Sequence, residues 1–235
     1  MAPLDLVTVA PDLYTVTSMT RFPGGIRMPQ RTTIARLSDG RLAVHAPLKP
    51  TDELLENVAA LGPVAYLVAP NLMHHLFVGH WKTRFPAAEI YAAPGLAKKR
   101  PDLAIAGELP ASTGAQAPAF ATALEPLAIE GAPRLGEHVF LHRKSRTLIV
   151  TDLVFHIVHP ENLPTRLLLT IMGTAGRFAM SRLFGTYVKD RAALRKSLDE
   201  MLTWDFVRVL PGHGEVYASE TAVADTRQAM ARAFA

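Results

Sequence analysis

The chain has 235 residues, of which 49% are hydrophobic and 20% are charged, so it has an ordinary globular composition with enough apolar material for a large core. The formal net charge is only +4, and scattered basic residues without interleaved aromatics argue against a nucleic-acid surface. The chain contains no cysteine, which excludes disulfides, thiolate zinc sites and a cysteine nucleophile. Because the sequence opens without a signal-peptide pattern and has no clean apolar run of ~20 residues, we expect a cytoplasmic protein with no transmembrane segment.

The first half of the chain predicts short strands followed by alternating helices and strands. A Thr51-Asp-Glu-Leu cap opens one helix, and Gly62-Pro63 ends it. The predicted strands are residues 6–9, 13–17, 32–37, 41–46, 64–69 and 89–92, and the predicted helices are 51–61, 74–84 and 94–100. Residues 104–118 lack periodicity and are expected to form a loop.

The second half repeats the order of strands before helices. Strands are predicted at 123–129, 137–142, 147–151 and 206–210, and helices at 164–187 (broken near 173–176), 190–202 and 219–233. His138 and His142 fall on one face of their strand and are expected to be exposed. Because strands precede helices in each half, we expect two sheets sandwiched between helices, an αββα arrangement within a single domain of residues 1–235.

Three strand ends carry side chains of the kind that bind metals. The stretch Pro70-Asn-Leu-Met-His-His75 follows one strand, Asp152 follows another, and His213 lies in a Gly-His-Gly turn after a third. The strand ends of α/β sheets hold ligands and metals, because the strands fix the backbone while the loops present side chains. Imidazole and carboxylate groups gathered there would suit one divalent ion such as zinc, iron or manganese.

The order of elements and these strand-end motifs resemble the metallo-β-lactamase superfamily, an αββα fold with metals in a cleft between its sheets. The resemblance covers essentially the whole chain. The segment 68–77 looks like a bacterial branch of lactamase-like proteins that is described only as a domain of unknown function. In the superfamily, a His-x-His-x-Asp-His motif, a bridging Asp and further histidines hold the metals.

The sequence departs from that motif at the ligands of one metal. When His75 is aligned with the last His of the motif, His74 takes the place of the Asp, Leu72 that of the second His and Pro70 that of the first. Neither Leu72 nor Pro70 can bind a metal through its side chain, and residues 130–134, where a third histidine is usual, contain none. The resemblance therefore implies that the chain holds at most one ion.

The predicted ligands of that ion are His75, Asp152 and His213, and each has an alternative role. His75 could cap a helix, Asp152 could cap the segment that follows it, and the glycines around His213 could simply make a turn. Side chains of adjacent helical residues point roughly 100° apart. We therefore expect one of His74 and His75 to bind the ion and the other to line the pocket.

Further residues are candidates for catalysis or substrate binding. His45, at a strand end where the superfamily often has an Asp, and His74 are predicted to transfer protons, since an imidazole titrates near neutrality. A buried, hydrogen-bonded His45 is the alternative. Asn71 is predicted to offer its amide to a substrate or else to cap the next helix, and His156 is predicted to line the substrate cleft.

Two functional hypotheses follow. The first is a metal-dependent hydrolase that acts on a small ester, lactone, amide or phosphoester. The second is a non-catalytic protein that binds a small molecule or regulates, and that kept the fold. The apolar segment 163–188, with Arg166, Arg177 and Arg182, would either cover the cleft and hold a carboxylate-bearing apolar ligand or pack against a second subunit of a homodimer. An amphipathic contact with a membrane surface is a third alternative, which the glycines of the segment disfavour because they weaken a helix.

Overall fold

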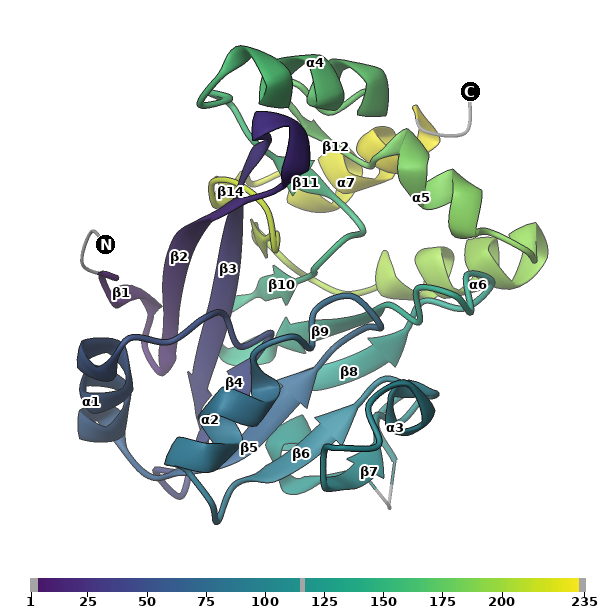
Figure 1. Cartoon of the computed structure of the whole chain (residues 1–235). Coiled ribbons are helices and arrows are strands. Elements are labelled where there is room, and N and C mark those ends of the chain that lie inside the picture. Colours follow the sequence, from purple (N-terminus) through teal and green to yellow (C-terminus); the bar gives the residue numbers. More distant parts are fainter. Residues whose placement is uncertain (1–3, 115–116, 233–235) are drawn as a thin grey trace.

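Two β-sheets face each other at the centre of the structure, a computed structural model that describes residues 4–114 and 117–232 (Figure 1). The larger sheet is antiparallel from β1 to β4 and parallel from β4 to β7. Its strands, in spatial order, are β1 (Val7–Ala10), β2 (Leu13–Arg21), β3 (Arg27–Arg36), β4 (Leu42–His45), β5 (Val64–Ala69), β6 (Glu89–Ala92) and β7 (Ile105–Glu108).

The second sheet is mostly antiparallel, but its strands β10 and β13 run parallel. Its spatial order is β14 (Tyr217–Ala218), β13 (Arg208–Leu210), β10 (Thr147–Ile149), β9 (His138–His142) and β8 (Glu125–Ala128). A further pair, β11 (Phe155–His156) and β12 (Phe178–Ala179), forms a small third sheet.

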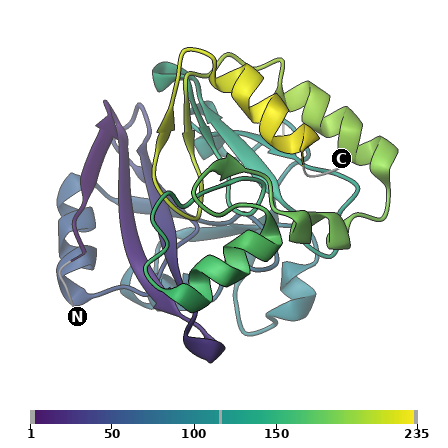
Figure 2. The same cartoon turned by 90° about the horizontal axis from the view of Figure 1, so that it is seen from above.

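Helices cover the outer sides of both main sheets, which confirms the predicted αββα arrangement. The larger sheet carries α1 (Asp52–Leu61), α2 (Val78–Arg84) and α3 (Leu96–Lys99). The second sheet carries α6 (Arg191–Met201) and α7 (Ala222–Ala231), which lie side by side (Figure 2). None of the helices in the described ranges combines the length and apolar character that crossing a membrane requires.

A third group of elements lies at one end of the sheets. It contains α4 (Leu163–Met172) and α5 (Arg182–Tyr187), and the 3-10 turn η1 (Pro23–Gly25) at the tip of the β2–β3 hairpin packs against α4 (Figure 1). The remaining 3-10 turns are η2 (Ala119–Thr122) and η3 (Arg143–Ser145). The break predicted near residues 173–176 of the helical segment 164–187 is confirmed, because Gly173 adopts a φ of 77° and ends α4.

The position of strand β5 between two hydrophobic clusters explains why all of its residues are hydrophobic. Tyr66 and Val68 point into the cluster between the two sheets, whereas Leu67 and Ala69 pack under the helices of the larger sheet. Alternate side chains of a strand point to opposite faces, so a strand covered on both faces needs no polar residues. The sandwich therefore covers β5 on both faces, and every residue of the strand except the partly buried Ala65 is buried.

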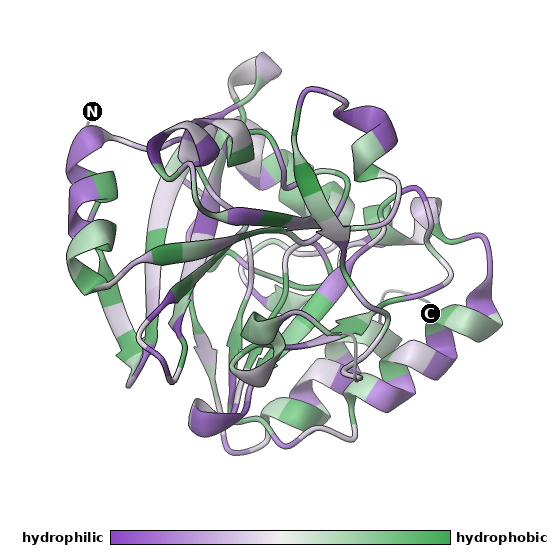
Figure 3. Ribbon diagram, turned by 90° about the horizontal axis from the view of Figure 1, so that it is seen from below, coloured by the Kyte–Doolittle hydropathy of each residue, from purple (hydrophilic) through white to green (hydrophobic). Residues whose placement is uncertain are grey.

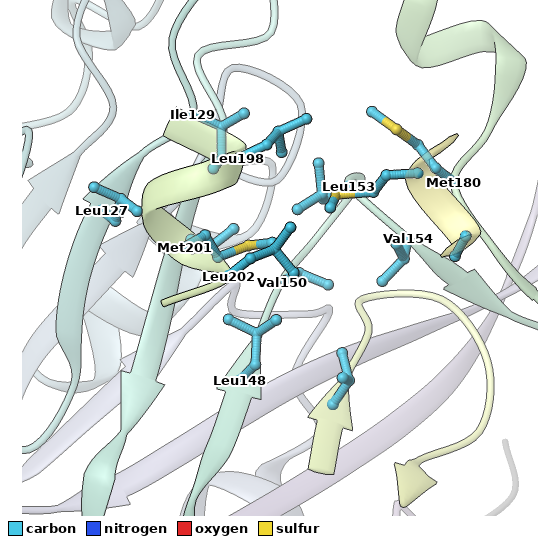
Figure 4. Packing of buried hydrophobic residues seen from close by; sticks show 14 of the residues in the cluster. Leu127, Ile129, Leu148, Val150, Leu153, Val154, Met180, Leu198, Met201 and Leu202 are labelled. Carbon is cyan, nitrogen blue, oxygen red and sulfur yellow. The ribbon is translucent and has the colours of Figure 1, made fainter. Parts of the chain in front are cut away.

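Helices α6 and α7 cover the outer face of the second sheet in the same way. Leu148 and Val150 pack against Leu198 and Met201 of α6 (Figure 4). Figure 3 shows hydrophobic and hydrophilic residues alternating along the helices, as expected when one helix face lies in a core. These two cores fix the strand ends that carry the candidate ligands.

Several expected elements differ from the structure. Strands β5 and β6 have the predicted bounds, but the predicted loop at 104–118 contains β7, and residues 115–116 lie outside the described ranges. The expectation that His138 and His142 are exposed is wrong: both are buried, since both faces of β9 are covered. The last helix ends at Ala231, and its predicted end, Ala233, lies outside the described residues.

Candidate metal centre

The parallel strands β10 and β13 deliver two of the candidate ligands to one place. Ile149 pairs with Leu210 at the end of these strands. Asp152 and His213 each lie the same number of residues beyond this pair. Because parallel strands end at the same edge of a sheet, the two side chains must emerge together. The sequence interpretation of these two strand ends is therefore consistent with the structure.

The two glycines around His213 are required by close contacts of the backbone. A Cβ atom on Gly212 would lie 2.9 Å from the carbonyl oxygen of Thr151, so a side chain there would push the two loops apart. Gly214 has a φ of 102°, and a Cβ atom would lie 2.0 Å from the carbonyl oxygen of His156. The Gly-His-Gly sequence therefore fixes how His213 enters the cleft.

The third member of the site is His74, which lies in a turn and not in a helix. Residues 71–77 form bends and turns, and α2 begins only at Val78, later than predicted. The side-chain oxygen of Asn71 accepts hydrogen bonds from the backbone N–H groups of Met73 at 2.8 Å and His74 at 2.7 Å. This cap holds the turn and points the two neighbouring histidines in different directions.

His74, Asp152 and His213 form a compact group of potential metal ligands. One ligand atom from each residue lies within 4.8 Å of the others. The Nε2 atom of His74 is 3.4 Å from Oδ2 of Asp152, and Nε2 of His213 is 3.3 Å from Oδ1. The carboxylate thus presents one oxygen to each imidazole, close to the separation that ligands of a single ion at about 2.0–2.2 Å require.

The hydrogen bonding of His213 indicates that this group fits a cation. Its Nδ1 atom lies 2.8 Å from the carbonyl oxygen of Pro29, which can only accept, so Nδ1 carries a proton. In the neutral ring Nε2 then has a lone pair that faces the carboxylate of Asp152. Two acceptors in this arrangement repel each other unless Nε2 gains a proton or a cation lies between them.

The charges of the group support the same interpretation. Burial alone would raise the pKa of Asp152, but the neighbouring His74 and His213 outweigh burial and hold that pKa well below its usual range. Burial would lower the pKa of His74, yet the charge of Asp152 prevails and raises it. Asp152 is therefore a carboxylate at neutral pH, as a metal ligand must be.

A buried polar network lies beneath Asp152. Glu137 is fully buried and accepts hydrogen bonds from the backbone N–H groups of Thr151 at 2.8 Å and Asp152 at 3.0 Å. The Asn71 amide nitrogen lies 2.6 Å from Glu137, 2.9 Å from the Thr151 hydroxyl and 2.7 Å from Oδ2 of Asp152. Burial, together with the charge of Asp152, raises the pKa of Glu137 to about 7. This network fixes the backbone and the carboxylate of Asp152.

A cleft of about 200 Å³ opens above the three residues. His74, Asp152 and His213 form its polar floor, and the ring of Phe155 stacks on His213 at a centroid distance of 4.8 Å. Most of the remaining walls are apolar and come from the turn at 73–76 and from residues 172–187. The apolar segment 163–188 therefore contributes to the cleft, as one of its expected roles requires.

The structure places the predicted ligand His75 away from this group. Its Nδ1 atom lies 3.2 Å from a guanidinium nitrogen of Arg100, and burial with the nearby Lys99 and Arg100 lowers its pKa. Within the described residues, the histidine that joins Asp152 and His213 is His74. The reason is the turn capped by Asn71, which sends the two adjacent side chains to different sides.

The other predicted site residues lie beside or below the cleft. His45 is buried with its ring edge against Phe140 at a centroid distance of 5.1 Å, and burial with the charge of His74 lowers its pKa to about 3. His156 does not line the cleft, and its Nδ1 atom contacts the carbonyl oxygen of Glu215 at 3.2 Å. Asn71 is fully buried within the polar network, so the structure shows the capping role and no free amide for a substrate.

Sequence reasoning missed Glu137 and the contribution of Pro29. A glutamate directly before a strand with the apolar centre Val139-Phe-Leu141 is a signal that could have identified Glu137. The Pro29 carbonyl gave no such signal, because a backbone acceptor can come from any residue. Its contact with His213 joins residues 184 positions apart.

Comparisons with known proteins agree with this architecture. A family model described as a domain of unknown function (DUF4336) matches residues 20–100, a region that contains His74 and ends before Asp152. No match was found among curated proteins.

The solved structures that resemble the chain include two metallo-β-lactamases and a flavodiiron core. The mono-zinc form of the metallo-β-lactamase FIM-1 from Pseudomonas aeruginosa has a TM-score of 0.65 and 14% identity over 99% of this chain and 96% of its own. A metallo-β-lactamase from Hirschia baltica has a TM-score of 0.66 and 12% identity over 96% and 97%. The metal-soaked flavodiiron core Flv1 from Synechocystis sp. PCC6803 has a TM-score of 0.66 and 12% identity, covering 96% of this chain and 60% of its own. Together with the two-sheet architecture, these similarities show that the protein has the metallo-β-lactamase fold.

Proposed function

We propose that the protein is a metal-dependent hydrolase that holds one divalent ion through His74, Asp152 and His213. The observation that carries the proposal is that two imidazoles and one carboxylate each place a potential ligand atom within 4.8 Å of the others at the floor of a cleft. Two nitrogens and one oxygen suit zinc, iron or manganese. When bound, such an ion supplies Lewis acidity, which polarises a substrate oxygen and lowers the pKa of water.

The positions that could hold a second ion argue for a single one. Pro70 and Leu72 stand where the related motif has its first two histidines, and neither side chain can bind a metal. The similar structure of FIM-1 in a mono-zinc form is an instance of this fold with one zinc. We therefore propose about one ion per chain.

The residues of the chain have distinct tasks in this proposal. The Pro29 carbonyl keeps the Nδ1 proton of His213 in place and leaves Nε2 available as a ligand. The network of Asn71 and Glu137 holds the Asp152 carboxylate between the two imidazoles. Apolar walls limit the access of bulk water, which strengthens electrostatic interactions at the floor.

The experiment compares metal content and turnover in one matched set of variants. Protein purified without a metal-binding tag is stripped, reloaded with zinc, iron or manganese, and assayed on panels of esters, lactones, amides and phosphoesters. We expect His213→Ala to lose both the metal and the turnover, whereas His80→Ala, at an exposed position on α2, keeps both. Turnover that survives in His213→Ala would come from surface groups and would overturn the proposal.

A second candidate, a non-catalytic binding protein, is favoured by one observation. Half of the ligand positions of the related two-metal motif are lost, while an apolar cleft remains. A metal-loaded protein that hydrolyses nothing in the panel, but gains thermal stability from a small apolar ligand, would support this candidate.

A further inference from the structure

The cleft above the candidate metal centre differs in polarity between its floor and its walls. The floor holds the Asp152 carboxylate between two imidazoles, whereas the walls include the side chains of Leu76, Leu183 and Phe184. An apolar wall contributes to binding only when an apolar group covers it. Gln30, Ser181 and Tyr187 also line the cleft, but most of the wall residues are apolar, so the part of a ligand that leaves the floor lies mainly against apolar side chains.

No lysine or arginine of the described residues lines this cleft. Arg177, from the segment that covers it, donates instead to the carbonyl oxygen of Gly173 at 2.9 Å and 2.7 Å. Among the described residues that line the cleft, only His74 and His213 can carry positive charge, and both already face Asp152. A carboxylate or phosphate that lies against the walls, away from the metal, would have no partner of opposite charge there, which is costly.

The size of the cleft sets a limit on the apolar group. Its volume is about 200 Å³. Sites for drug-sized ligands are larger, at about 300–1,000 Å³. A short acyl chain or one aromatic ring fills such a space.

We propose that the substrate is a carboxylic ester, lactone or amide with a small, neutral, apolar acyl group that carries no second carboxylate and no phosphate. This inference rests on the proposed hydrolase for its reaction and on the cleft alone for its binding preference. The inference agrees with the expectation that the segment 163–188 covers the cleft. It disagrees with the expectation that this segment binds a carboxylate, since Arg166, Arg177 and Arg182 do not line the cleft.

The test uses metal-free protein, because a metal would bind carboxylates by itself and hide the preference of the walls. Pentanamide and pentanoate have nearly the same shape and differ in charge. Their dissociation constants are measured at pH 8 by ligand-observed NMR for wild type, Leu183→Arg and Leu167→Arg. Leu183 lines the cleft and is 47% exposed, whereas Leu167 on α4 is 61% exposed and does not line it, so the second variant is a matched control.

We expect wild type and Leu167→Arg to bind pentanamide at least about tenfold more tightly than pentanoate, a difference of about 1.4 kcal/mol. Leu183→Arg should reduce or reverse this preference for pentanamide, because it supplies a cation at the wall. Leu76→Arg, at a second exposed position of the wall, should have the same effect. Equal binding of the two ligands by wild type, no binding of either, or equal effects of Leu183→Arg and Leu167→Arg would overturn the inference.

A second measurement separates this inference from the proposed hydrolase. Metal-loaded protein is assayed on 4-nitrophenyl butyrate and 4-nitrophenyl phosphate, and we expect only the butyrate ester to be hydrolysed with a dependence on His213. If neither is hydrolysed while metal-free protein still prefers pentanamide, the hydrolase fails and the binding preference stands. A phosphoester hydrolysed in preference to the ester would contradict the substrate class and leave the hydrolase intact.

Discussion

The floor and the walls of the cleft are built in opposite ways. On the floor, Asp152 is held through its backbone by Glu137 and through its carboxylate by Asn71, and His213 is held by Pro29. On the walls, Leu76 and Leu183 are more than one-third exposed and make no polar contact through their side chains. A floor that is fixed by many hydrogen bonds suits a centre that requires exact ligand positions, while a loosely packed wall can adapt to a ligand. Changes to the floor should therefore alter metal binding, and changes to the walls should alter the choice of substrate.

The largest effect is expected for the carboxylate itself. Asp152→Asn removes the negative charge between the two imidazoles while it preserves the shape of the side chain. Since loss of an outer partner alone typically costs 10–100-fold in metal affinity, loss of this ligand should cost more than about 100-fold. Metal affinity is measured by competition with a chelator, with Asp205→Asn, whose side chain is 73% exposed, as the control. Unchanged affinity in Asp152→Asn would mean that the metal binds elsewhere.

The next effect should come from the buried carboxyl group below the floor. Glu137→Gln puts an amide where a carboxylate now accepts hydrogen bonds from Thr151, Asp152 and Asn71. The NH2 group of the new side chain would then face a donor group of one of these partners, and neither could accept the hydrogen bond. We therefore expect a 10–100-fold loss of metal affinity and a loss of about 1–3 kcal/mol in the free energy of unfolding. Glu130→Gln, at an exposed position, is the control for both the chelator competition and the denaturant titration. A variant with wild-type metal affinity would show that Glu137 does not position Asp152.

These expectations show what the sequence could and could not predict. The pairing of Asp152 with His213 followed from two strand ends, since parallel strands place their ends together whatever the details of the loops. The choice between His74 and His75 did not follow, because it depends on a turn capped by the Asn71 side chain. The same limit applies to Glu137, whose partners are far from it in sequence.

The fold was predictable to a similar degree. The bounds of β5 and β6 were correct because their apolar runs end at clear turn signals. The strands β11, β12 and β14 have two residues each, which is too short for a local pattern to mark them. The burial of His138 and His142 was missed because alternation in one strand does not reveal that both of its faces are covered.

A smaller effect concerns the pH dependence of stability, to which His45 contributes from below the floor. Burial lowers the pKa of His45 to about 3, from an ordinary value of 6.5. A base with a lowered pKa in the folded state takes up a proton more readily when unfolded, so its contribution to stability is present above 6.5 and is lost as the pH falls. Between pH 6.5 and pH 5 this loss amounts to about 2 kcal/mol.

The contribution of His45 can be isolated by substitution. His45→Phe removes the titrating group and keeps an aromatic ring beside Phe140. Denaturant titrations at pH 7.5 and pH 5 should show a smaller fall in the free energy of unfolding for this variant than for wild type. An equal fall in both proteins would mean that His45 is not a buried neutral imidazole.

The smallest effect is expected for the outer face of the walls. Leu163, Leu167 and Ile171 are exposed along one side of α4. Leu167→Lys should change stability by less than about 0.5 kcal/mol, since it alters a solvent-exposed site away from the floor. Metal affinity should also be unchanged. Thermal melting and chelator competition check both values, and a loss of metal affinity would show that the floor and this face are coupled.

The most direct test of the account is the metal content of three proteins purified in parallel: wild type, His74→Ala and His75→Ala. The two histidines are neighbours in the sequence, but only His74 lies with Asp152 and His213 among the described residues. We expect about one ion per chain in wild type and in His75→Ala, and loss of the ion in His74→Ala. Loss of the ion in His75→Ala with retention in His74→Ala, or two ions per chain in wild type, would contradict the account.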